Sequence, residues 1–253
     1  MLLHDEQQKA VEQILSSFDG RMSQIIAQIE RLLNRYLLTT DMSATNALKF
    51  DVAFNNILQQ SGYYVLVNRM IDTDYDELFS LISDGFSAGG LALSYTADDL
   101  SRVMALKALQ ANQFSVVGTT AGTALRENLF KYVLSNYTLE DMQAKLVQDF
   151  QGTNLVKHSR TLANTAIKEF QEGMIDIGAE GLDGVWLYVG VKDSKNRDFC
   201  RCVLDKKAYY DDNEKNKLKY DKERTFNCRH RFRMVTEDYA KVSGYSKSNG
   251  ISC

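Results

Sequence analysis

The sequence predicts a mainly α-helical protein with a small α+β core near its C-terminal end. Three observations support this fold class. The 253-residue chain contains no proline, a residue that breaks helix interiors, so long helices are favoured. Apolar residues recur at helical spacing through much of residues 11–177. Aromatic and β-branched residues then gather at 185–189, which is typical of a strand.

A long helix with a heptad seam is predicted for residues 8–37. Gly20 interrupts the pattern and marks a candidate bend, since glycine lowers helix stability. The seam predicts either a coiled-coil contact with another molecule or packing within the protein's own domain. We favour packing within the domain, because one helix of the same chain is enough to cover a seam. The apolar a and d positions are Val11, Leu15, Phe18, Met22, Ile25, Ile29, Leu32 and Tyr36.

Further helices are expected through the middle of the chain. One should run from Ala44 to about Met70 and another from Thr96 to Ala111, with Thr96 as its N-cap. The Gly/Thr-rich stretch 117–123 is interpreted as a turn or helix start, because a phosphate-binding loop needs Lys and then Ser or Thr after its second glycine. We expect four segments: the N-terminal helix 1–40, a helical body 41–155, an α+β core 156–240 and a flexible tail 241–253.

Composition narrows the class of protein. At 44% hydrophobic residues the chain is globular rather than disordered. It contains no run of about 18 apolar residues, so no transmembrane helix is expected. Residues 1–6 lack the basic and apolar regions of a signal peptide, so we expect a cytoplasmic protein. In that compartment the four cysteines favour free thiols or metal ligands over disulfides.

Charge is distributed unevenly along the chain. Residues 192–253 carry a balance of +6, whereas residues 1–191 carry −9. A basic end predicts contact with a polyanion or an acidic partner surface, and a solvated face explains it equally well. Any affinity for DNA should be weak, sensitive to salt and carried by residues 192–247, because phosphate contacts release counterions.

The unusual residues concentrate between Trp186 and Arg233, a stretch with the only tryptophan and three of the four cysteines. A strand around Trp186 is followed by a loop, then a charged insert at 205–225, and then a return segment at 226–235. The last long helix, 155–177, precedes the strand. The motif residues, in chain order, are Arg160, Thr161, Trp186, Asp193, Arg197, Phe199, Cys200, Asn227, Cys228, Arg229, His230 and Arg231.

This order of residues resembles the C-terminal core of MuF-like phage head morphogenesis proteins, also called minor head or minor capsid proteins. The resemblance covers roughly residues 115–235 and is strongest in the last third. Two positions differ from the family pattern: Phe232-Arg233-Met234 stands where relatives often have a proline, and one residue rather than two separates Cys200 from Cys202.

The resemblance implies a structural protein of the virion, without enzymatic activity, cofactor or membrane. Its expected location is the capsid interior or the portal vertex, and the host cytoplasm during assembly. The expected partners are the portal protein, packaged DNA and other head proteins. Head morphogenesis is the implied function, with a role in genome delivery in some systems.

Zinc binding is one alternative. Cys200, Cys202, Cys228 and His230 are suitable ligands, although structural sites usually place two to four residues between the members of a pair. Positions i and i+2 of a strand share a face, so the geometry permits a site. Buried thiols packed in a small core are the structural alternative, which we favour.

A nucleic-acid-processing enzyme is a second alternative, with His230 as general base and arginines that stabilise a developing anion. We favour a structural role, because the sequence shows no set of nucleophile, base and orienting group. A third alternative is a coiled-coil adaptor that binds through residues 1–40.

The return segment is expected to pair with the Trp186 strand, and Arg229 or Arg231 to neutralise Asp193. Strand alternation predicts a core face and a second face that meets carboxylates or solvent. The core face holds Phe226, Cys228, His230 and Phe232, and the second face holds Asn227, Arg229, Arg231 and Arg233.

Overall fold

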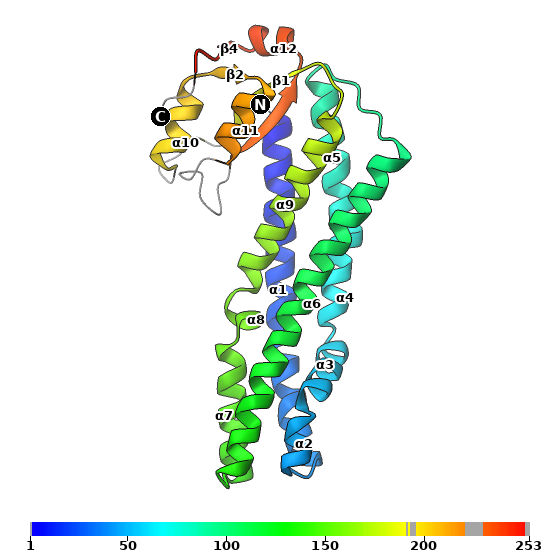
Figure 1. The fold of residues 1–253 in the computed structure, drawn as a ribbon, viewed down its shortest axis with the longest axis vertical. Coiled ribbons are helices and arrows are strands. Elements are labelled where there is room, and N and C mark those ends of the chain that lie inside the picture. The colour runs from blue at the N-terminus through cyan, green and yellow to red at the C-terminus, as the bar shows by residue number, and fades with distance from the viewer. Residues whose placement is uncertain (1, 191, 193–195, 221–229, 251–253) are drawn as a thin grey trace. The chain divides into compact units, whose positions relative to one another are not determined.

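The computed structural model describes residues 2–190, 192, 196–220 and 230–250. It is 76% helical, with a four-stranded sheet near the C-terminal end (Figure 1), so the predicted fold class is confirmed. The chain divides into two compact units. The sheet unit holds residues 1–11, 76–106 and 167–253, and the helical unit holds residues 12–75 and 107–166. Each unit combines separate stretches of the chain, whereas each of the four expected segments is one continuous stretch. The boundaries of those four segments remain predictions.

The helical unit is built from helices alone in the part of it that is described. It takes in most of α1 and α6, the start of α9, and several shorter helices. The elements are α1 (Leu2–Thr39), α2 (Ala44–Leu48), α3 (Phe50–Ser61), α4 (Tyr63–Arg69), a π-helical turn (Met70–Asp74), α6 (Ala97–Leu134), α7 (Leu139–Gly152), α8 (Asn154–Lys157) and α9 (Ser159–Ala179).

Helix α1 is continuous across Gly20, which confirms a helix over residues 8–37. Its buried face follows the predicted seam as far as Ile29 and then continues through Leu33 and Leu37 instead of Leu32 and Tyr36. An α-helix has 3.6 residues per turn, so it drifts by about 20° per heptad relative to a repeat of 3.5. The drift explains why the buried face moves by one position near the end of the helix.

The helix expected from Ala44 to Met70 is divided into three. Gly62 separates α3 from α4 with a φ of +85°, a left-handed conformation that glycine adopts without a steric penalty. Lys49, with φ −98° and ψ 7°, separates α2 from α3. The glycine was visible in the sequence, but its conformation was not.

The turn expected at residues 117–123 is wrong, because α6 runs through it without interruption. Gly118 and Gly122 lie one turn apart and let this helix approach its neighbours closely. A Cβ at Gly118 would lie 2.8 Å from Cδ1 of Leu58, and a Cβ at Gly122 would lie 3.0 Å from Cδ1 of Phe54. The expected N-cap at Thr96 is confirmed by reciprocal hydrogen bonds with Asp99.

The sheet unit carries a mixed sheet in the strand order β3-β1-β2-β4. Strand β1 pairs antiparallel with β2 and β3, and β2 pairs parallel with β4. Besides parts of α1, α6 and α9, its elements are α5 (Tyr75–Ala88), β1 (Val185–Val189), α10 (Asp198–Asp205), β2 (Ala208–Tyr210), α11 (Asp212–Lys219), β3 (Arg231–Val235), α12 (Glu237–Val242) and β4 (Ser246–Lys247).

Three expectations for this unit are corrected. The loop expected between the Trp186 strand and the charged insert contains most of α10, and the charged insert contains β2 and α11. Helix α11 begins with a capping box, in which Asp211 and Glu214 each accept a hydrogen bond from the other's backbone N–H. The expected flexible tail contains β4, because the N–H groups of Ser246 and Ser248 donate to the chain around β2.

The glycines of α1 and α6 give a matched test of this packing. Gly20→Ala should raise the free energy of unfolding by about 1 kcal/mol, because a Cβ there meets no atom within 4 Å and alanine is the better helix former. The free energy of unfolding of Gly118→Ala should be about 1–3 kcal/mol lower than that of Gly20→Ala, because the added methyl group overpacks against Leu58. Urea denaturation of both variants measures the difference, and equal effects would contradict the close approach.

Candidate functional site

The pairing of β1 with β3 positions the candidate site. Trp186 lies opposite Met234, and Tyr188 lies opposite Phe232. All four side chains are buried on one face of the sheet, as alternation predicts. The expected pairing of the return segment with the Trp186 strand is therefore confirmed for Arg231–Val235, whereas residues 226–229 lie outside the described residues.

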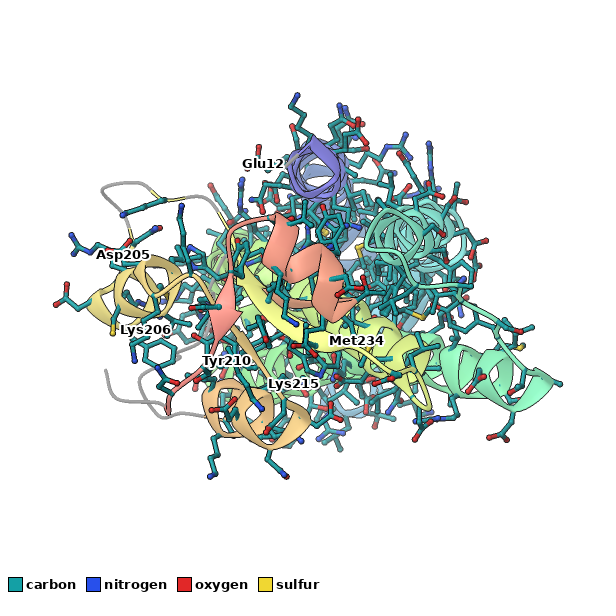
Figure 2. The ribbon with its side chains drawn as sticks, turned by 90° about the horizontal axis from the view of Figure 1, so that it is seen from above. Glu12, Asp205, Lys206, Tyr210, Lys215 and Met234 are labelled. Atoms are coloured by element: carbon teal, nitrogen blue, oxygen red, sulfur yellow. The ribbon has the colours of Figure 1, made fainter. Side chains whose placement is uncertain are left out.

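Trp186 is fixed by two polar groups of α11. Its indole Nε1–H donates a 2.6 Å hydrogen bond to Oδ1 of Asp212. The Nζ of Lys215 lies 4.4 Å from the centroid of the ring, a cation–π contact. Figure 2 shows Lys215 with Tyr210 and Met234, which lie opposite Trp186 on the two neighbouring strands. These contacts hold α11 against the sheet.

Lys215 is a charged residue with only 7% of its surface exposed, so it needs a partner. Its Nζ donates to Asp176 of α9 at 2.6 Å, and Lys219 donates to the same carboxylate at 2.5 Å. Lys219 also lies 3.7 Å from Glu172. Burial alone would raise the pKa of Asp176, but the hydrogen bonds from the two lysines outweigh it and lower that pKa below its ordinary value.

Tyr188, Cys200 and His230 form a second buried group, the Tyr–Cys–His cluster. The hydroxyl of Tyr188 lies 3.5 Å from Sγ of Cys200, and the Tyr188 and His230 rings stack with their centroids 5.6 Å apart. Gly190 makes room for the imidazole, because a Cβ there would lie 2.0 Å from its Cδ2 atom. His230 is 4% exposed, so in this conformation its ring serves packing and has little access to a substrate.

The arginines of β3 lie on the opposite face from the tryptophan. Arg233 donates from Nη2 to the carbonyl oxygen of Gly85 at 2.8 Å, in the last turn of α5, where backbone carbonyls and the helix dipole favour a cation. Its guanidinium also lies 5.6 Å from the centroid of the Tyr239 ring. Burial, and secondly the like charge of Arg233, lower the pKa of Arg231 to about 10.

The expectation that this face meets carboxylates or solvent is therefore wrong for Arg233, which meets a carbonyl oxygen and an aromatic ring. A strand pattern indicates which face a residue occupies, but it does not identify the group opposite. The expected ion pair of Asp193 with Arg229 or Arg231 stays a prediction, because Asp193 and Arg229 lie outside the described residues.

The proposed zinc ligands do not share the geometry expected of a strand. Cys200 and Cys202 lie on α10, where side chains two positions apart point about 200° apart around the axis. Cys202 is disulfide-bonded, which corrects the expectation of free thiols or metal ligands at this position. Cys228 lies outside the described residues. Within the described ranges, no three His, Cys, Asp or Glu side chains lie close enough together to hold a metal ion.

The remaining motif residues have different surroundings. Arg160 and Thr161 are exposed at the start of α9 and belong to the helical unit, where Arg160 pairs with Asp19. In the sheet unit, Arg197 is the exposed N-cap residue of α10, and Phe199 is buried in the first turn of that helix. Asp193, Asn227, Cys228 and Arg229 lie outside the described residues. Of the expected motif residues, the structure therefore brings Cys200 and His230 together around Tyr188, while Trp186 contacts α11 and Arg231 lies on the other face of the sheet.

Sequence reasoning missed Tyr188, Asp176 and Lys215. The spacing of Asp211 and Glu214 was the one available signal for α11, and hence for the lysines that it carries. Asp176 gave no signal, because it lies in a helix of mixed polarity and its partners are 39 and 43 residues away along the chain.

Comparison with protein-family models found no match, and searches of curated proteins and of solved structures found none either. None of the described helices combines the length and apolarity needed to cross a membrane.

Asp176→Asn tests the ion network. The variant should lose about 1.5–3 kcal/mol of unfolding free energy at pH 7, the range for hydrogen bonds to charged groups, because it leaves the buried Lys215 without its carboxylate. This is less than the cost in a fully buried pair, since the Asp176 side chain is 39% exposed. Asp198→Asn removes the exposed carboxylate that pairs with Arg201 and should change stability little.

The pH dependence provides a second readout of the same pair. Because its pKa is lowered in the folded protein, Asp176 contributes stability that is present above about pH 4, the ordinary range of aspartate, and is lost as the pH falls further. The difference in unfolding free energy between wild type and Asp176→Asn should therefore become smaller in acid. A gap that stays constant from neutral pH into acid would contradict the charge pairing.

Gly190→Ala tests the packing of His230. The added methyl group should destabilise the protein by about 1–3 kcal/mol, because the imidazole is buried and has no room to move aside. His230→Ala removes the ring, so the double variant should be more stable than the sum of the two single effects predicts. Denaturant melts of the four proteins measure this coupling, and additive effects would show that Gly190 and His230 are not in contact.

Proposed function

We propose that the protein is a minor head protein of a bacteriophage, which acts in head morphogenesis at the portal vertex. The observation that carries this proposal is the antiparallel pairing of β1 with β3. It joins the strand of Trp186 to the return segment across the charged insert, and both segments belong to the part of the chain where the resemblance to MuF-like proteins is strongest. The rest of the proposed role, with the portal protein, packaged DNA and other head proteins as partners, comes from that resemblance.

The character of the cluster supports a structural role. His230 and Cys200 are buried against Tyr188, and Trp186 and Lys215 are buried against each other. Groups of this kind specify a fold, because Trp186, Lys215 and Tyr188 have defined polar partners and the aromatic rings exclude water. Catalytic groups, in contrast, must reach a substrate.

Contact with DNA is the part of the proposal that the charge distribution supports. Exposed lysines of the sheet unit include Lys206 and Lys207 after α10, Lys217 on α11, and Lys241 and Lys247 near the end of the described chain. Cations on separate elements suit non-specific phosphate contacts, whose affinity falls steeply with salt.

Purified virions of the parent phage provide the test. Quantitative mass spectrometry should detect the protein in them at far lower copy number than the major capsid protein, and pull-down should recover it with the portal ring. A matched variant, Trp186→Ala, should weaken portal recovery if the sheet unit is the binding module, while the control Asp198→Asn should not.

Two results would contradict the proposal. One is the absence of the protein from complete, infectious particles. The other is stoichiometric zinc in the purified protein together with metal-dependent nuclease activity, which would favour an enzyme built on the Cys, His and Arg residues.

A further inference from the structure

A positively charged groove lies on the helical unit, lined by residues of α1, α3 and α4 and by Gly62 between the last two. Helices α3 and α4 follow one another in the same direction and run antiparallel to α1 (Figure 1). The groove is open to solvent and has a volume of about 490 Å³, within the range of about 300–1,000 Å³ for ligand sites. We name it the arginine groove after Arg21 and Arg31 of α1 and Arg69 of α4, all three of which line it. None of the residues discussed above as part of the candidate site lines it.

The three arginines concentrate positive charge at one place on a unit that carries no net charge. The helical unit holds eleven Lys and Arg and eleven Asp and Glu residues, so it has no net charge. None of the described residues that line the groove is acidic, and no described carboxylate forms an ion pair with Arg21, Arg31 or Arg69. The charge of the groove is therefore available to an incoming anion.

The floor between the arginines is apolar. Ile25 and Leu66 are buried there, and Val65 is 71% exposed, which is a large fraction for an apolar side chain in a concave site. Gln24 and Gln28, which also line the groove, carry amides that can both donate and accept hydrogen bonds. The groove thus suits a peptide: its arginines match carboxylates, its apolar floor matches an apolar side chain, and its amide groups match the polar backbone.

We propose that the arginine groove binds a short acidic segment of a partner protein. Its carboxylates pair with the guanidinium groups, which favour bidentate contacts, and an apolar side chain covers Val65. Arg21 and Arg31 are ten residues apart on one helix, about 15 Å along the axis, a span that about five residues of extended peptide cover. The proposal does not depend on a role in the virion.

A nucleic acid fits the groove less well. Proteins that bind single strands stack bases on aromatic side chains, and no aromatic residue is among the described residues that line this site. Duplex binding relies on a basic surface that follows the phosphates, whereas this unit is neutral overall and its cations are local.

Fluorescence anisotropy with the full chain tests the proposal. The probe is a short synthetic peptide of glutamate and leucine residues, and its counterpart carries glutamine in place of glutamate. The acidic peptide should bind more tightly than its counterpart, and its affinity should fall as salt is raised. Arg21→Gln, Arg31→Gln and Arg69→Gln should each weaken binding about two- to fivefold, and the triple variant about tenfold or more.

Matched controls separate the groove from general charge. The triple variant Lys49→Gln, Lys131→Gln, Lys157→Gln removes three exposed cations of the same unit that do not line the groove, and it should bind as wild type does. Val65→Ser should weaken the binding of the acidic peptide without affecting the binding of an oligonucleotide. Circular dichroism confirms that each variant is folded, which the exposure of Arg31, Val65 and Arg69 favours.

Each of the following results would overturn the proposal: no binding of the acidic peptide to wild type, equal losses in the two triple variants, or tighter binding of a single-stranded oligonucleotide through the same arginines. Self-association that the arginine variant abolishes would also overturn it, because the occupant would then be a second copy of this chain.

Discussion

The antiparallel register between β1 and β3 is the constraint on which the sheet unit depends. It places Trp186 opposite Met234 and Tyr188 opposite Phe232, so that one face of the sheet is aromatic and closely packed. A shift of the register by one residue would move each of these side chains to the other face. Trp186 would then lose Asp212 and Lys215, and the ring of His230 would no longer lie over Tyr188.

The other face of the sheet fixes the same register with different chemistry. Leu187, Tyr209, Val235 and Ala240 form an apolar cluster there, and Arg233 crosses from β3 to the carbonyl of Gly85. A slipped strand would put a guanidinium into the aromatic face, where a charge without a partner is costly. The two arginines of β3 therefore contribute to specificity of pairing as well as to stability, since each side of the strand tolerates only one set of residues.

Much of the fold could be predicted from the sequence because it depends on local periodicity. The spacing of Val11 to Ile29 was enough for α1, and the β-branched and aromatic run around Trp186 was enough for β1. The uninterrupted α6 was missed because a helical glycine that permits close packing looks, in sequence, like a glycine that makes a turn. Gly118 differs from Gly62 only in its three-dimensional neighbours and backbone angles.

The candidate site could be predicted only in part. The order of segments along the chain predicted that the Trp186 strand pairs with the return segment, since an apolar strand needs a neighbouring strand. The pairing of Asp176 with Lys215 could not be foreseen, because it connects two helices that β1, α10 and β2 separate along the chain. The α-helical conformation of Cys200 and Cys202 was missed for a similar reason: a short helix in a polar segment carries little signal of its own.

Hydrogen–deuterium exchange at single-residue resolution tests the β1–β3 pairing most directly. The β3 amides that donate to β1 and the β1 amides that donate to β3 should be protected together and should exchange with the same opening free energy, because these hydrogen bonds break together when the two strands separate. Protected amides in β1 beside rapidly exchanging amides in β3 would contradict the pairing, and with it the structural basis for relating the Trp186 strand to the return segment.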